Sequence, residues 1–176
     1  MSSPKLIELG GIEAGKDAHN VSLNQSYFDI SASTWPPIRM SNGDAHVQST
    51  YTGKIGSVIT GLGWNACPWA HLDITQPHLL KCGAVKSVSS TVNALSIPSK
   101  RRTDADFVPF GVAIVDGAEI ASPLVMVGDT ATITAVTNAS QYIAYYYPEI
   151  EVFFKLKTGN DLGLVEYDWE IEAEET

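Results

Sequence analysis

The C-terminal part of the chain alternates apolar and polar residues with a period of two. Before Thr158, one face is apolar and the other is charged except for Phe153; the apolar set is Ile150, Val152, Phe154 and Leu156. After Asp161 the alternation resumes, with Val165, Tyr167, Trp169 and Ile171 set against Glu166, Asp168, Glu170 and Glu172. A period of two is the signature of a strand with one buried and one wet face. We therefore expect two antiparallel strands joined by a turn at Thr158-Gly159-Asn160-Asp161.

Strand signals also fill the rest of the chain, and no stretch holds a 3.6-residue period over three turns. The expected strands cover residues 20–30, 46–51, 54–60, 85–95, 107–115, 120–127 and 130–136. Asp116-Gly117 lies between two apolar runs and predicts a tight hairpin, because both turn positions need a positive φ. Gly128-Asp129 marks another reversal. A helix of one or two turns is expected only over Gln76–Lys81.

This pattern predicts an all-β fold. We expect a single antiparallel β-sandwich, jelly-roll-like, of about eight to ten strands. The sandwich would span residues 19–176, and residues 1–18, with Gly10-Gly11 and Gly15, would form a flexible N-terminal arm. With 176 residues, of which 44% are hydrophobic and 18% charged, the chain is long enough to bury a core.

The net charge of the chain disfavours one class of binding partner. Twenty acidic and eleven basic residues give a net charge of -9, which disfavours nucleic-acid binding because that needs a positive field. No apolar run has the length of a transmembrane helix or the pattern of a signal peptide. We therefore expect synthesis in the cytosol, with the virion as a further location if the chain belongs to a viral particle.

One spacing suggests a metal site. Cys67, His71, His78 and Cys82 could supply the two thiolates and two imidazoles of a tetrahedral zinc centre. The residues between them include Leu72, Ile74 and Leu79, which favour a core, and prolines that restrict how the segment can wrap. We therefore predict no metal here and expect buried thiols, with a disulfide between the two cysteines left open.

The sequence holds no catalytic signature. It lacks a Gly-x-Ser-x-Gly elbow, a His-Glu-x-x-His helix and a glycine-rich phosphate loop before a helix. A catalytic pair of carboxylates can come from residues far apart in the sequence, so sequence spacing does not test for it. The acidic residues at 166, 168 and 170 are more simply explained as the solvated face of a strand. We predict that the protein is not an enzyme and has no catalytic, cofactor-binding or metal residues.

Basic and aromatic residues in several parts of the sequence are candidates for a binding surface. Lys100-Arg101-Arg102 is the one basic cluster, and the acids that follow it indicate a solvated loop tip. Tyr145-Tyr146-Tyr147 would place its first and third rings on one strand face and its second on the other. Tyrosines at such positions suit subunit contacts, sugar platforms and membrane interfaces, or the rim of a core. Three of the four tryptophans, among them Trp35 and Trp64, lie in loop-like segments and are candidate contact residues.

These observations favour a structural role. The chain has the general character of jelly-roll capsid or virion-associated proteins, a likeness of fold alone. We expect a non-enzymatic subunit of a larger homo-oligomeric assembly, whose partners are copies of itself and other shell proteins. Two alternatives stay open: a carbohydrate-binding, lectin-like module that takes a sugar ligand, and a membrane-binding or pore-forming β-protein.

Overall fold

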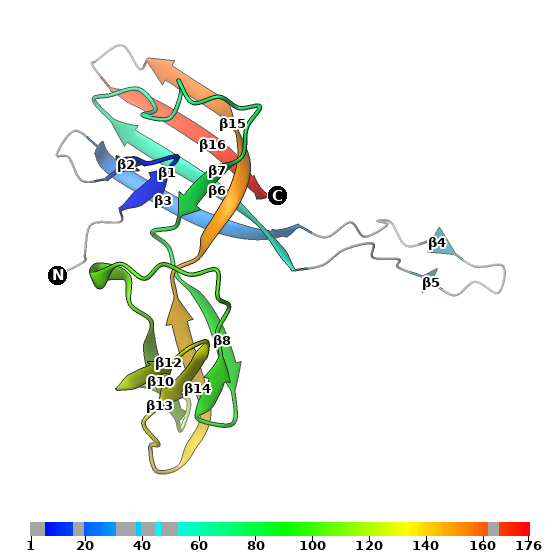
Figure 1. The fold of residues 1–176 in the computed structure, drawn as a ribbon, viewed down its shortest axis with the longest axis vertical. Helices are drawn as coiled ribbons and strands as arrows, with labels where there is room; N and C mark the ends of the chain where they lie inside the picture. Colours follow the sequence, from blue (N-terminus) through cyan, green and yellow to red (C-terminus); the bar gives the residue numbers. More distant parts are fainter. Residues whose placement is uncertain (1–5, 16–19, 31–37, 40–44, 47–52, 162–165) are drawn as a thin grey trace. The chain divides into compact units, whose positions relative to one another are not determined.

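The computed structural model describes residues 6–15, 20–30, 38–39, 45–46, 53–161 and 166–176. Within these residues the chain is built from antiparallel strands, and the only helical element is a short 3-10 helix, η1, over Ala105–Phe107 (Figure 1). The all-β prediction is therefore confirmed. No helix of the described residues is long and apolar enough to cross a membrane.

The chain divides into two compact units. The large unit comprises Met1–Lys5, Leu9–Leu79 and Glu151–Thr176, and the small unit comprises Leu6–Glu8 and Leu80–Ile150. The predicted start of the folded domain at residue 19 stays a prediction, because residues 16–19 lie outside the described ones. Inside the expected arm, Gly10 and Gly11 have φ values of 58° and 82°. They form the two-residue turn between strands β1 (Ile7–Leu9) and β2 (Ile12–Ala14), since two consecutive positive φ angles are what a type I′ hairpin needs.

A seven-stranded sheet has the order β2-β1-β7-β15-β16-β6-β3. Its strands are β1 (Ile7–Leu9), β2 (Ile12–Ala14), β3 (Asn20–Ile30), β6 (Lys54–Gly63), β7 (His78–Lys81), β15 (Glu149–Asp161) and β16 (Tyr167–Glu175). The short strands β4 (Ile38–Arg39) and β5 (Ala45–His46) pair with each other. The strand expected over 46–51 otherwise lies outside the described residues.

Strand β16 lies inside this sheet, between β15 and β6, and follows the predicted alternation. Trp169, Ile171 and Ala173 are buried, while Glu174 on the other face is exposed. The ring of Trp169 packs edge-on against Trp69, with ring centroids 5.5 Å apart. The period of two thus marks the buried face correctly.

Two local predictions near this sheet are wrong. Thr158–Asp161 do not form a turn: they continue β15 and pair with β16 beyond an irregularity between Leu156 and Thr158. The reason is that the first half of β16 needs a partner strand, which this backbone supplies. Residues 78–81 are strand β7 rather than part of a helix, because Leu80 is fully buried while its neighbour Leu79 is 44% exposed, again a period of two.

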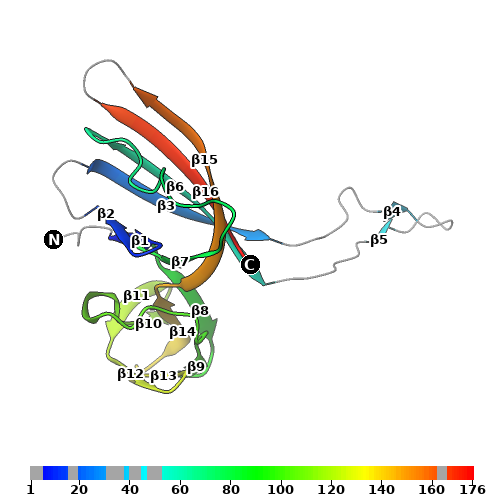
Figure 2. The same cartoon turned by 45° about the horizontal axis from the view of Figure 1, so that its top comes forward.

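The small unit contains two sheets. The four-stranded sheet has the order β11-β10-β14-β8, and the three-stranded sheet has the order β12-β13-β9 (Figure 2). Their bounds are β8 (Lys86–Ser90), β9 (Ala94–Ser96), β10 (Phe110–Val115), β11 (Ala118–Ser122), β12 (Leu124–Val127), β13 (Thr130–Ile133) and β14 (Ala139–Tyr146). Both sheets contribute to one apolar core, which comprises Leu95, Ile97, Ala113, Ala131, Ile133, Tyr142, Ala144 and Tyr146.

Both hairpin predictions in the small unit are confirmed. Asp116 and Gly117 have φ values of 50° and 80° between β10 and β11. Gly128, at φ 59°, begins the two-residue turn between β12 and β13. The apolar run expected as one strand over 120–127 is two strands instead. Pro123 divides it, because proline cannot donate to a ladder, and each half joins a different sheet.

Candidate functional site

The acidic residues of β16 form a row on the face of the large unit's sheet opposite Trp169. In the ladder with β6, Asp168 lies across from Leu62, Glu170 from Thr60 and Glu172 from Val58. The ammonium group of Lys157 lies 2.8 Å from a Glu172 carboxylate oxygen and 3.4 Å from one of Glu170. The hydrogen bond from Lys157 lowers the pKa of Glu172, and the same bond raises the pKa of Lys157.

A groove of about 300 Å³ lies at one end of this row. It is lined by Ser22, Thr60, Gly61, Leu62, Asp168, Trp169 and Glu170. The Oδ1 atom of Asp168 is buried, and no described residue donates a hydrogen bond to it. A buried acceptor without a donor is costly, so this oxygen has the capacity to take a hydroxyl group or a water molecule. Carboxylates beside serine and threonine hydroxyls suit a polyhydroxylated ligand.

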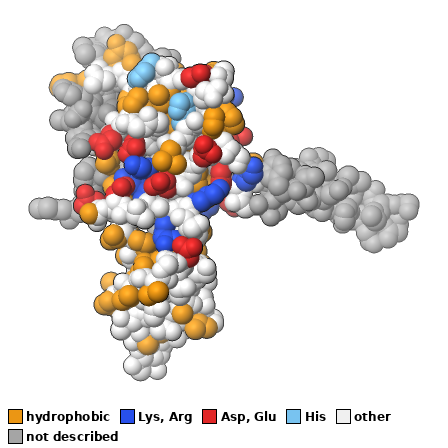
Figure 3. Space-filling view, viewed as in Figure 1, with side chains coloured by type: hydrophobic (Ala, Val, Ile, Leu, Met, Phe, Trp, Pro, Cys, Tyr) orange, Lys and Arg blue, Asp and Glu red, His pale blue; other side chains and the backbone are white. Residues whose placement is uncertain are grey.

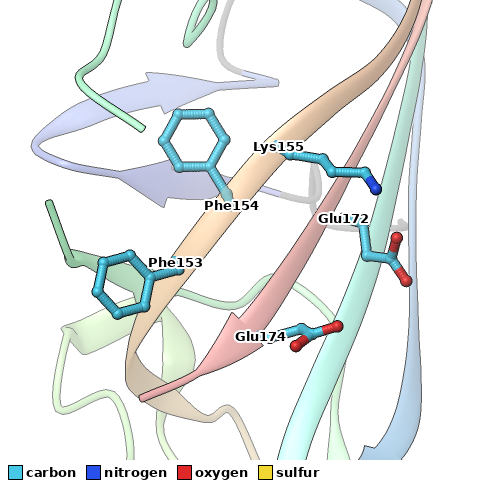
Figure 4. A pocket seen from close by; sticks show the side chains of 5 residues that line it. All are labelled: Phe153, Phe154, Lys155, Glu172 and Glu174. Carbon is cyan, nitrogen blue, oxygen red and sulfur yellow. The ribbon is translucent and has the colours of Figure 1, made fainter. Parts of the chain in front are cut away.

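A second pocket, of about 230 Å³, lies along the β15–β16 ladder. Figure 4 shows the five residues that line it. Phe153 lies across from Glu174 and Lys155 from Glu172, so these four side chains share the exposed face of the ladder, whereas Phe154 is 5% exposed on the other face. Phe153, the exception to the alternation of its strand, is 46% exposed. The pocket combines an aromatic ring with both signs of charge, but none of its side chains has a buried polar atom that lacks a hydrogen-bond partner.

The four residues of the suggested zinc spacing do not gather into one centre. Within the described part of the chain, no group of three or more histidine, cysteine or acidic residues is placed to hold a metal ion. His78 instead makes a 2.8 Å hydrogen bond through Nε2 with the Asp73 carbonyl, and its ring packs edge-on against Phe154.

Both cysteines are free and buried, as expected for structural thiols. Cys67 lines a pocket of about 150 Å³ with Ala66, Ala70, Leu156 and Trp169. Burial raises the pKa of the Cys67 thiol, with a smaller opposing effect from backbone hydrogen bonds. A raised pKa disfavours the thiolate, so this cysteine is not arranged as a nucleophile.

The expectation of a solvated loop tip is wrong for two of the three basic residues: Lys100 is exposed, but Arg101 is partly buried and Arg102 is buried. Arg102 is 2% exposed; it donates to the carbonyls of Leu6 and Cys82 and to Asp104, and it lies 3.3 Å from the centre of the Phe107 ring. Arg101 forms a 2.7 Å ion pair with Asp129 and donates to two further carbonyls. Both guanidinium groups hold segments of the small unit's backbone together, because a planar group with five N–H donors can bond several carbonyl oxygens at once.

The tyrosine cluster divides between core and surface as its alternation predicts. Tyr146 is 4% exposed and belongs to the core. Tyr145 points to the other face, where it stacks on Phe110 with ring centroids 5.0 Å apart and its hydroxyl lies 3.3 Å from Glu119. Burial and the charge of Glu119 both raise the pKa of Tyr145.

The loop tryptophans have different environments. Trp69 is fully buried and donates from Nε1 to the Ile12 carbonyl at 2.8 Å. Trp64 is 55% exposed, which agrees with a surface position, whereas Trp35 lies outside the described residues.

The surface feature that sequence reasoning missed is the free edge of β12, the side on which no other strand of the described residues pairs with it. This strand is the last in its sheet, and its whole sequence is Leu-Val-Met-Val. Val125 is 61% exposed and Val127 is 74% exposed, whereas Leu124 and Met126 pack against the core. Figure 3 shows hydrophobic side chains gathered along one side of the small unit. A strand with apolar residues on both faces was visible in the sequence, but its position at an edge was not.

Comparison of the chain with protein-family models, with curated proteins and with solved structures finds no match.

Proposed function

We propose that the protein is a non-enzymatic structural subunit of a larger homo-oligomeric assembly, such as a viral capsid or a virion-associated shell. Its partners are copies of itself and other shell proteins. The jelly-roll-like sandwich expected from the sequence is part of this proposal; a core shared by the two sheets of the small unit supports it.

The free apolar edge of β12 carries the proposal. An edge strand presents unpaired backbone groups, and proteins that stay monomeric protect such edges with charge, proline or a covering element. β12 has no charged residue. Other apolar side chains of the small unit are also exposed, namely Val108 at 57%, Phe110 at 44% and Ile120 at 42%. Exposed apolar side chains along an unprotected strand edge are typical of a site where another chain adds a strand.

The test is the mass of the purified protein in solution over a wide range of concentration. Sedimentation velocity and light scattering should find species larger than the 19.0 kDa monomer, and electron microscopy should find regular particles or arrays at the highest concentrations. A single monomeric species up to high micromolar concentration would refute the proposal.

A carbohydrate-binding module is the second candidate, and the groove at Asp168 favours it. The unpartnered Oδ1 atom and the neighbouring Thr60 and Ser22 side chains suit sugar hydroxyls. A glycan array should then give binding that Asp168→Asn abolishes. Glu174→Gln, on the same strand face but outside this groove, is the matched control and should bind normally. An array without signal for the unmodified protein would exclude this role.

A further inference from the structure

The pairing of β12 with β13 determines which backbone groups of β12 point toward its free edge. In that ladder Val127 lies across from Thr130 and Val125 from Thr132, and a two-residue turn follows Val127. The pair that flanks such a turn is hydrogen-bonded, and hydrogen-bonded pairs alternate with non-hydrogen-bonded ones along an antiparallel ladder. The N–H and C=O groups of Leu124 and Met126 therefore point away from β13, toward the free side.

These outward groups fit a second copy of the same strand. Two antiparallel edges bond only where outward-pointing groups meet, so Met126 or Leu124 of one copy must face an outward-pointing residue of the other. Residues directly opposite each other share a face of the sheet. The exposed valines of one copy would then lie beside exposed side chains of the other, and the core-facing Leu124 and Met126 would stay on the core side of both.

The possible registers differ in the residues that lie opposite the exposed Val125 and Val127. When the two-fold axis passes through Met126, each Val125 lies opposite Val127 of the second copy. When it passes through Val125, Val127 faces Pro123; when it passes through Val127, Val125 faces Asp129. Only the first register places each of the four exposed valines opposite another valine, and it lets Met126 exchange two backbone hydrogen bonds with Met126 of the second copy.

Charge also favours a second copy at this edge. The small unit holds five basic and seven acidic residues, whereas the large unit holds six basic and thirteen acidic ones. Like-charge repulsion between copies is therefore weakest at the small unit, and Asp129 beside the edge is already paired with Arg101.

We propose that β12 pairs with β12 of a second copy about a two-fold axis at Met126, which joins two three-stranded sheets into one of six strands. This inference rests on the proposed function and names the contact through which assembly begins. Four residues bury less than the roughly 800 Å² per partner of a standard interface. The contact alone is therefore weak, and it depends on protein concentration.

Cysteine cross-linking tests the register. Val125→Cys protein is mixed with Val127→Cys protein under mild oxidation, with one of them tagged. Opposite residues of a non-hydrogen-bonded pair lie about 4.5 Å apart at Cα, within the range of a disulfide. We expect the mixed disulfide to form in preference to either self-linked dimer. Val92→Cys, in a turn of the same unit and 59% exposed, is the matched control and should not cross-link.

A charge variant tests the contact itself. Val127→Lys should weaken association about tenfold or more, because each two-fold contact places two lysines among apolar side chains. Val92→Lys should associate normally, and circular dichroism should show that both variants are folded. If the unmodified protein assembles but Val127→Lys does so equally well and no mixed disulfide forms, the β12 pairing is refuted while the structural role stands. If the unmodified protein is monomeric throughout, the proposed function fails first and the pairing with it.

Discussion

Gly61→Ala is the substitution whose cost the structure defines most sharply. Gly61 lies opposite Trp169 in the β6–β16 ladder. A Cβ atom at Gly61 would lie 2.1, 2.2 and 2.7 Å from three atoms of the Trp169 ring, whereas carbon atoms in contact are about 3.5–4.0 Å apart. The ring cannot retreat easily, because it is 2% exposed and packs against Trp69, which is itself fully buried.

The cost follows from overpacking. Adding volume to a packed core typically costs about 1–3 kcal/mol, and we expect the upper end because the overlap exceeds an ångström and the ring is enclosed. For a chain of this size, about 3 kcal/mol corresponds to a fall in melting temperature of about 6–12 °C. Urea titration followed by circular dichroism measures the change. Thr60→Ala, one residue away with its side chain on the opposite face, is the control and should cost less than about 1 kcal/mol.

A double-mutant cycle isolates the clash. Trp169→Ala alone should cost about 3–5 kcal/mol, because it empties the centre of the core. Once the ring is gone, Gly61→Ala should add almost nothing, so the two effects should fall short of additivity by about the full cost of Gly61→Ala. Additive effects, or a Gly61→Ala protein as stable as the unmodified one, would refute this account of the packing.

Three further outcomes are expected. Deletion after Asp161 removes an inner strand of the large sheet and should give insoluble or unfolded protein, whereas Glu170→Gln should fold normally; expression and circular dichroism distinguish them. Arg102→Ala should destabilise the protein by about 2–4 kcal/mol in denaturant titration, because two backbone carbonyls lose a charged donor. The lowered pKa of Glu172 means that its pairing with Lys157 stabilises the fold above the usual carboxyl range and that this contribution is lost as pH falls through that lowered pKa. In Lys157→Met the free energy of unfolding should therefore fall less steeply as the pH is lowered through the carboxyl range. An acid dependence equal to that of the unmodified protein would contradict the pairing.

Local patterns were sufficient for much of the fold. The alternation around Trp169 predicts which face of β16 is buried, because a strand's side chains alternate whatever the strand pairs with. Asp116-Gly117 predicts its hairpin, because few other residue pairs adopt two positive φ angles. The tyrosines at 145 and 146 divide between surface and core for the same reason of period two.

Features that depend on distant partners could not be predicted in the same way. Thr158–Asp161 have turn chemistry, yet they extend β15 because β16 lies alongside to pair with them. Arg102 sits in a run of charges that suggests solvent, yet it is buried because carbonyls of residues 6 and 82 converge on its guanidinium group.

The sequence by itself determined the class of structure, since period-two patterning and turn residues act over a few neighbours. Only the tertiary structure decided which strands lie at the edges, since an edge is defined by the absence of a neighbour in space. The run Leu124–Val127 is predicted from the sequence only as part of a strand, and its place at the end of a sheet makes it the exposed apolar edge on which the proposed assembly depends.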